Sequence, residues 1–208
     1  MKQGKVKTFP HQSGIYEIES LAFALESLVT SLTESETERV RFESLAHRDV
    51  LTGLANRTAL RKYLNDAQLT TNDYVCFYID LDGFKTVNDT YGHASGDDVL
   101  IEIANRLKRI SLEGAYPVRL SGDEFFLLFE RKGRSDHDIK EIGEAIISSL
   151  SEEITFEGGA TTVGASIGAA LWRSDTVPHL AIERADEALY RSKANGKHQI
   201  TLDESLIA

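Results

Sequence analysis

The chain has 208 residues, 41% of them hydrophobic, which suits one globular domain with a core of its own and an additional segment. Its 33 acidic and 23 basic residues give a formal net charge of -10, which argues against broad electrostatic binding to nucleic acid or anionic lipid. No apolar run approaches the ~20 residues of a membrane span, and the polar N-terminus lacks a secretory-type hydrophobic region. We therefore predict a cytoplasmic protein with no membrane contact.

The segment up to residue 46 is predicted to be one long helix, because no Pro or Gly lies between Ile15 and Asp49. Hydrophobic residues recur in it with the a/d spacing of a coiled-coil seam, at Ile18, Leu21, Leu25, Leu28 and Leu32. The repeat weakens at Ser35 and Arg39. This pattern favours a stalk that pairs with a second copy, although an amphipathic helix packed on its own domain has the same pattern. We predict a tail and stalk over residues 1–46 and a separate domain over residues 47–208.

Helical and strand patterns alternate through the rest of the chain. Helices are predicted over 57–67, 94–110, 135–150 and 179–195, and strands over 74–80, 116–120, 124–130, 161–172 and 198–202. Such alternation predicts an α/β fold in which helices surround a mixed sheet.

Carboxylates stand where two of these strands end. Asp80 closes the apolar run YVCFYID, and Asp123 and Glu124 lie at the tip of the predicted hairpin VRLSGDEFFLLF. If the two strands are neighbours, Asp80 and Asp123 converge, and two hard oxygen ligands with open positions suit Mg²⁺ shared with substrate phosphates. A solvated turn residue is the alternative interpretation of each of these acids, and for Asp80 alone it is the favoured one.

Five ordered motifs carry a family resemblance: DVLTGLANR, IDLDGFKTVNDTYGHASGDDVL, RLSGDEF, ASIGAA and ADEALYRSKANGK. Together they resemble the GGDEF family of diguanylate cyclases, which join two GTP molecules into cyclic di-GMP, and the resemblance covers about residues 46–202. It implies a nucleotidyl-cyclase-like mixed sheet surrounded by helices, and catalysis by a homodimer in which two bound GTP molecules face each other.

The resemblance implies a metal site and an acid pair. Asp80, Asp123 and the carbonyl of Leu81 correspond to the ligands of Mg²⁺ or Mn²⁺, with two ions expected per active site. Asp123 is also expected to help remove the proton from the attacking 3′-hydroxyl, and Glu124 is the second acid of the signature. Lys85 is counted with these residues as catalytic.

Phosphate binding is expected from two segments. The turn Gly83, Phe84 and Lys85 resembles a phosphate-cradling loop, whose backbone N–H groups and lysine face the β- and γ-phosphates. Lys193 and Lys197 are four residues apart at the end of the predicted last helix, so both are expected to point toward the triphosphate. The family usually has Arg at the second position. Lys197 keeps the positive charge of that Arg but lacks the planar group that binds a phosphate through two hydrogen bonds.

Asn88 and Asp97 are the expected guanine-reading residues. A carboxylate accepts from both N1–H and the exocyclic amine of guanine, whereas N1 of adenine is an acceptor, so Asp97 would discriminate against ATP. Without the resemblance, Asp97 would be interpreted as an acid at a helix N-terminus.

The signature departs from the family at Ser121, which replaces a glycine. Gly122 is predicted to need a positive φ and close approach to the nucleotide, whereas Ser121 fits if its φ is negative. Its hydroxyl could then cap the turn or bind a ribose or phosphate oxygen. Both residues are counted among the substrate-binding positions.

The family's upstream product-binding motif, Arg-x-x-Asp, is absent, because Leu112 and Ala115 occupy its charged positions. We therefore expect that cyclic di-GMP does not inhibit through the usual site. Two functions remain open from the sequence. One is an active diguanylate cyclase. The other is an inactive GTP-binding regulatory module, of the kind found in a longer chain with a cyclic di-GMP phosphodiesterase domain.

Overall fold

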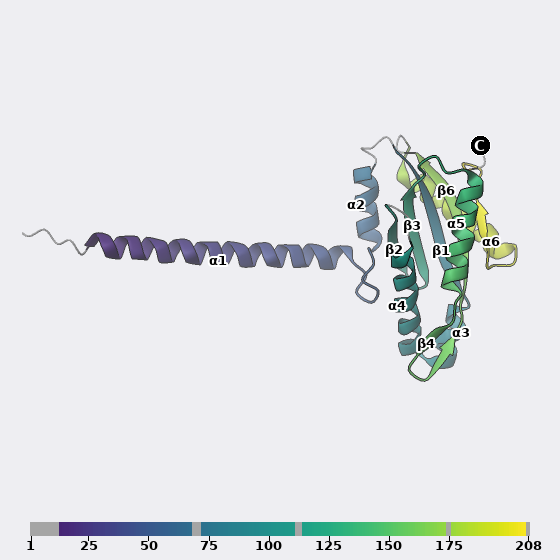
Figure 1. Cartoon of the computed structure of the whole chain (residues 1–208), viewed down its shortest axis with the longest axis horizontal. Coiled ribbons are helices and arrows are strands. Elements are labelled where there is room, and N and C mark those ends of the chain that lie inside the picture. The colour runs from purple at the N-terminus through teal and green to yellow at the C-terminus, as the bar shows by residue number, and fades with distance from the viewer. Residues whose placement is uncertain (1–12, 68–71, 111–113, 174–175, 207–208) are drawn as a thin grey trace, which may run out of the picture. The chain divides into compact units, whose positions relative to one another are not determined.

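The computed structural model describes residues 13–67, 72–110, 114–173 and 176–206, and the chain divides into two compact units, Met1–Ser44 and Leu45–Ala208. Helix α1 (Ser13–His47) makes up the described part of the first unit, which confirms one long helix (Figure 1). Its seam residues are 53–61% exposed at Leu21, Leu25, Leu28 and Leu32, while the side chain of Ile18 lies outside the described ones. None of the described helices is long and apolar enough to span a membrane.

The second unit is built on a five-stranded sheet with strand order β2-β3-β1-β6-β7, in which β6 and β7 are parallel and the other pairs are antiparallel. The predicted mixed sheet with surrounding helices is therefore confirmed (Figure 1). The elements of the sheet unit are α2 (Arg57–Ala67), β1 (Asp73–Asp82), α3 (Phe84–Tyr91), α4 (His93–Arg109), β2 (Tyr116–Ser121), β3 (Glu124–Glu130), α5 (Asp136–Leu150), β4 (Ile154–Phe156), β5 (Gly159–Thr161), β6 (Gly164–Arg173), α6 (Pro178–Ala194) and β7 (Ile200–Leu202). Helix α3 and the β4–β5 hairpin were not predicted.

Helices bury both faces of the central strand, which explains its continuous apolar run. Alternate residues of β1 belong to different clusters: Phe77 and Ile79 pack with residues of α3, α4 and α5, whereas Cys76 and Tyr78 pack with α2 and α6. Asp80 continues the second set, so its side chain faces α6. At the end of β1, the apolar side chains that pack against α6 are therefore followed by a polar one, Asp80.

Helix α6 lies directly on β6 because one residue there has no side chain. A Cβ atom at Gly168 would lie 2.0 Å from the carbonyl oxygen of Ala185 and 2.1 Å from the backbone nitrogen of Leu189. Small residues of α6, including Ala181, Ala185 and Ala188, are buried along the helix. This close packing sets the distance between the sheet and Lys193 near the end of α6.

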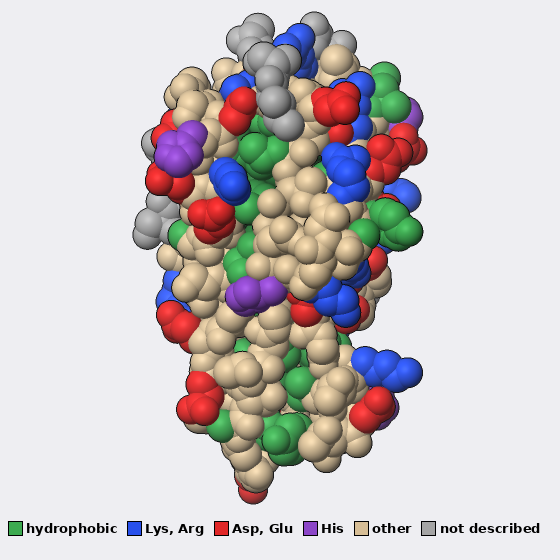
Figure 2. Space-filling view, turned by 90° about the vertical axis from the view of Figure 1, so that its right-hand side faces the viewer, with side chains coloured by type: hydrophobic (Ala, Val, Ile, Leu, Met, Phe, Trp, Pro, Cys, Tyr) green, Lys and Arg blue, Asp and Glu red, His purple; other side chains and the backbone are tan. Residues whose placement is uncertain are grey.

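Charges of both signs are interspersed over the face of the molecule that Figure 2 shows, without a continuous basic surface on that face. The basic residues on this face are therefore separate side chains and form no single basic patch. The chain's net charge of -10 makes such local groups more important.

Candidate active site

The ends of β1 and β3 bring the signature acids next to Asp80. The strands pair antiparallel with Asp80 opposite Glu124, and the Leu81 N–H donates to the Asp123 carbonyl oxygen over 3.3 Å. The two strand ends are therefore neighbours, which is the condition on which the convergence of Asp80 and Asp123 depended. The structure places Asp80, Leu81 and Asp123 at one corner of the sheet, as the metal assignment requires.

This corner carries more negative than positive charge. Burial raises the pKa of Asp80, and the carboxylates of Asp123 and Asp82 raise it further, against the opposing effect of Lys193. Lys193 Nζ lies 2.7 Å from Asp80 Oδ2, so α6 supplies the cation that pairs with this carboxylate. A site in which acids disfavour one another's ionised form has the chemistry that a divalent cation stabilises.

The donor set fits Mg²⁺ held together with a substrate. Two carboxylates and one carbonyl leave coordination positions for water and phosphate oxygens, which is the usual arrangement for this ion. Among the described residues, no group of three or more His, Cys, Asp or Glu side chains is placed to hold a metal.

The predicted phosphate turn is the start of helix α3. Gly83 has a φ of 83°, a conformation that glycine adopts without strain, and its carbonyl accepts from Thr86 N–H over 2.9 Å. Phe84 is 8% exposed, and its side chain packs in the core. The exposed Lys85 follows in the first turn of the helix, where backbone N–H groups favour anions.

The guanine-reading positions lie on α3 and α4, which pack against each other. The Asn88 amide lies over Gly96: a Cβ atom there would be 1.9 Å from Asn88 Oδ1. Asp97, the next residue of α4, is exposed. The structure therefore brings Asn88 and Asp97 onto neighbouring parts of one helix pair, and Gly96 makes room for the asparagine, a role that the sequence did not indicate.

The hairpin tip explains why serine fits the signature. Gly122 has a φ of 47°, whereas the described non-glycine residues with positive φ are Lys132, Lys197 and His198. Ser121 therefore keeps an ordinary backbone conformation. Its Oγ donates to Glu124 Oε2 over 2.7 Å, so the hydroxyl holds the second acid of the signature.

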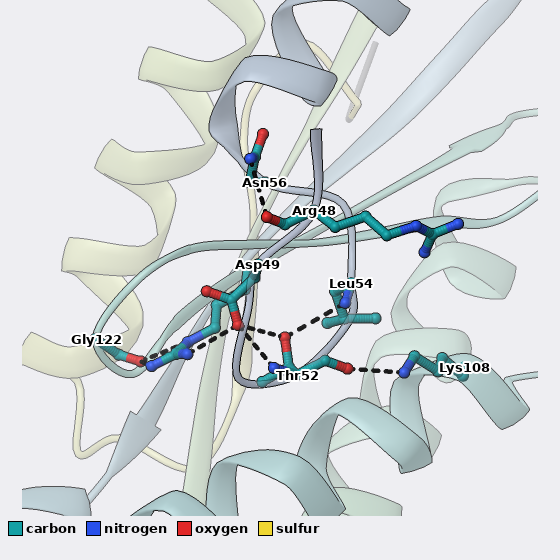
Figure 3. Close-up of polar contacts among 8 residues, drawn as sticks. Arg48, Asp49, Thr52, Leu54, Asn56, Lys108 and Gly122 are labelled. Atoms are coloured by element: carbon teal, nitrogen blue, oxygen red, sulfur yellow. Dashed lines mark hydrogen bonds and ion pairs between the residues drawn. The ribbon is translucent and has the colours of Figure 1, made fainter. Parts of the chain in front are cut away.

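A polar network that the sequence did not predict holds the tip of the β2–β3 hairpin (Figure 3). Arg119 Nη1 donates to Asp49 Oδ1 over 2.9 Å, and Arg119 Nε and Nη2 donate to the Gly122 carbonyl over 3.1 and 2.9 Å. Thr52 donates to the same Asp49 oxygen through its N–H and its hydroxyl. Burial alone would raise the pKa of Asp49, but the hydrogen bonds from Thr52 and Arg119 outweigh it and lower the pKa.

The expected helical (i, i+4) relation between Lys193 and Lys197 was wrong. Helix α6 ends at Ala194, Gly196 has a φ of 112°, and Lys197 has a left-handed φ of 63°. Lys193 and Lys197 therefore do not form an (i, i+4) pair on one helix face. Lys197 lies in the turn between α6 and β7, and its side chain is exposed.

The predicted loss of the upstream inhibitory motif falls partly outside the described residues, because Leu112 lies there. Ala115 is described and packs against the apolar core. It brings no charge to this position.

Comparison with known proteins places the chain. Residues 46–199 match the family described as "Diguanylate cyclase, GGDEF domain". The chain is 36% identical over 183 residues to the bifunctional diguanylate cyclase/cyclic di-GMP phosphodiesterase MucR of Pseudomonas aeruginosa, covering 86% of this chain and 26% of that protein. It is 34% identical over 205 residues to the diguanylate cyclase TpbB of the same species, covering 93% of this chain and 46% of that protein. The chain thus spans about a quarter to a half of the length of these relatives.

A solved structure matches both units. The coiled coil and GGDEF domain of DgcB from Caulobacter crescentus, in complex with c-di-GMP, has a TM-score of 0.79 and 27% sequence identity, covering 88% of this chain and 99% of that one. The family match over most of the chain and the relatives above agree with this likeness. The chain therefore belongs to the GGDEF domain family of diguanylate cyclases.

Proposed function

We propose that the protein is a diguanylate cyclase that condenses two GTP molecules into cyclic di-GMP. The 3′-hydroxyl of each GTP attacks the α-phosphate of the other, and each attack breaks the bond to the β-phosphate and releases pyrophosphate. The observation that carries this proposal is the pairing of β1 with β3, which sets Asp80 opposite Glu124 and Asp123 beside Leu81. A fold match alone would not suffice, because one fold can host active and inactive members.

Asp80, Asp123 and the carbonyl of Leu81 would hold Mg²⁺ or Mn²⁺, with two ions proposed per site. When bound, these ions would neutralise the charge of the phosphates during nucleotidyl transfer. Lys193 adds a fixed positive charge beside Asp80, and the N-terminal N–H groups of α3 with Lys85 bind the outer phosphates.

Recognition of the base falls to Asn88 and Asp97. Asp97 accepts from N1–H and the exocyclic amine of guanine, and an adenine in the same position would leave the carboxylate facing an acceptor. GTP is therefore the proposed substrate rather than ATP.

The signature acids handle the attacking hydroxyl. Asp123 accepts its proton, and Glu124 adds negative charge beside it, held by Ser121. Burial raises the pKa of Tyr78 to about 12, and the neighbouring Glu124 contributes to that rise, so the phenol stays protonated beside this acid. Glu124 is thus kept in place by neighbours that donate hydrogen bonds.

Incubation with GTP and Mg²⁺, followed by separation of the nucleotides, tests the proposal. We expect cyclic di-GMP from GTP and none of the corresponding dinucleotide from ATP. GTP that binds tightly but stays unchanged at high protein concentration would instead establish the regulatory module.

Activity is expected to require a homodimer, because each domain binds one GTP and the reaction joins two. Specific activity should rise with protein concentration, and deletion of residues 1–45 should lower it at low concentration, since the exposed leucines of α1 are the proposed pairing surface. A fused dimeric coiled coil of unrelated sequence should restore the rate. A deletion variant with an unchanged rate per chain at low concentration would remove the proposed role of the stalk.

Gly96→Ala is expected to weaken GTP binding by about tenfold without loss of stability. The new methyl group would displace the end of the Asn88 side chain, while alanine is the better residue within a helix by about 1 kcal/mol. Calorimetric titration and thermal unfolding measure the two effects. The double variant Gly96→Ala/Asn88→Ala should bind no worse than Asn88→Ala, and undiminished binding by Gly96→Ala would contradict the base-reading role of Asn88.

Ser121→Gly is expected to change turnover by less than about tenfold, or about 1.4 kcal/mol of barrier. The serine has no backbone strain to relieve, and the variant loses one hydrogen bond to Glu124. Initial rates of cyclic di-GMP formation provide the measurement. A gain in turnover of about a hundredfold would mean that Ser121 strongly limits the activity of the natural protein.

A further inference from the structure

The turn after α6 has an unusual backbone. Three consecutive residues have positive φ: Gly196 at 112°, Lys197 at 63° and His198 at 50°. Glycine adopts such angles freely, but side chains with a Cβ atom disfavour them, and two such residues in succession persist only when their surroundings hold them.

Two side chains from the sheet hold this turn. The His198 N–H donates to Asp82 Oδ2 and to Ser166 Oγ, each over 3.1 Å. Ser166, which is fully buried, donates its own hydroxyl proton to Asp82 Oδ2 over 2.7 Å. The last residue of β1 and a residue of β6 therefore form a common anchor, the Asp82–Ser166 pair, for one backbone N–H group.

A glycine next to the Asp82–Ser166 pair leaves room for it. A Cβ atom at Gly164, which pairs with Asp82 across the strands, would lie 3.0 Å from Asp82 Cβ and 3.5 Å from His198 Nδ1. The glycine thus lets the aspartate and the histidine lie together against β6.

Asp82 differs in its contacts from Asp80, two residues earlier on the same face of β1. Asp80 pairs with Lys193, whereas Asp82 uses one oxygen for the anchor. Its other oxygen, Oδ1, is buried without a hydrogen-bond partner among the described residues. The acceptor at Oδ2 is therefore the part of Asp82 that the turn needs.

We propose that Asp82 and Ser166 are positioning residues that, through the His198 N–H, fix Lys197 in the conformation from which it binds a nucleotide phosphate. The proposal rests on the proposed function, since Lys197 is assigned to phosphate binding only there. Asp82 acts through the backbone of His198 and makes no contact with the nucleotide.

The test uses 3′-deoxy-GTP, which lacks the attacking hydroxyl, so binding is measured without turnover. With Mg²⁺ present, Asp82→Ala and Lys197→Ala should each weaken binding by about tenfold, and the double variant should bind no worse than Lys197→Ala. Asp82→Asn, whose amide oxygen can replace Oδ2 as acceptor, should stay within about threefold of the natural protein. Losses that multiply to about a hundredfold in the double variant would overturn the proposal, because Asp82 would then act independently of Lys197.

Hydrogen exchange at the His198 amide tests the anchor without any nucleotide. Exchange should be faster in Asp82→Ala and near natural in Asp82→Asn, with the amides of β1 and β6 unchanged. Equal protection of this amide in all three proteins would overturn the anchor. Binding of 3′-deoxy-GTP without formation of cyclic di-GMP from GTP would refute the proposed catalysis alone, whereas a protein that binds neither nucleotide would overturn both proposals.

Discussion

Asp123→Ala is expected to reduce the formation of cyclic di-GMP by at least about a thousandfold, equivalent to about 4 kcal/mol of barrier. The variant removes a proposed metal ligand and a proton acceptor from the corner where β1 meets β3. Binding of GTP should fall less than turnover, because the phosphate contacts of α3 and the base contacts of Asn88 and Asp97 remain. Initial rates and calorimetric titration with 3′-deoxy-GTP separate the two quantities.

Asp73→Ala is the matched control for this variant. Asp73 is an exposed acid at the opposite end of β1, so its replacement changes the net charge equally without touching the corner. We expect near-natural activity from it. Undiminished activity of Asp123→Ala would mean that the metal assignment is wrong, and equal losses in both variants would point to net charge instead of ligation.

Much of the sheet could be predicted because its strands have unambiguous local patterns. The apolar run before Asp80 and the run after Glu124 are buried on both faces, so each appears as a continuous hydrophobic stretch. Their pairing was only a condition in the sequence analysis, and the register with Asp80 opposite Glu124 meets that condition.

Helix α3 and strands β4 and β5 were not predicted, because short elements contain too few residues to show a clear hydrophobic pattern. Strands β4 and β5 have three residues each, fewer than an alternating pattern needs. Helix α3 has eight residues, begins after a glycine and contains β-branched and short polar residues, so propensity does not favour it. It forms because Phe84 and Val87 are buried in the core, which is tertiary information.

The predicted last helix ended at residue 195, so the (i, i+4) relation expected between Lys193 and Lys197 reached beyond it. Asn195 and Gly196 are typical of a helix C-terminus, and the glycine adopts the positive φ that such an end requires. The networks around the site had no such signal. Asp49 and Arg119 are 70 residues apart, and Ser166 and Asp82 are 84 apart, so only the fold shows that they meet.

Gly168→Ala is expected to lower the free energy of unfolding by about 3 kcal/mol or more. The added Cβ would lie about 2 Å from two backbone atoms of α6, and backbone cannot rotate away as a side-chain end can. The helix must therefore move off β6, which also opens the packing of Ala185 and Leu189 against the sheet. For a domain of this size the change corresponds to a melting temperature about 6–12 °C lower, measurable by circular dichroism.

Gly159→Ala provides the control for Gly168→Ala, since it makes the same chemical change in a strand. Its new Cβ would meet its nearest atom, on the Phe156 ring, at 3.4 Å, so stability should change little. Gly168→Ala should in addition lose activity at temperatures where it remains folded, because displacement of α6 draws Lys193 away from Asp80, now 2.7 Å from it. A Gly168→Ala protein that melts within about 2 °C of the natural one would mean that α6 does not pack on β6 as closely as the structure has it. The placement of Lys193 in the site depends on that packing, so it would then be wrong as well.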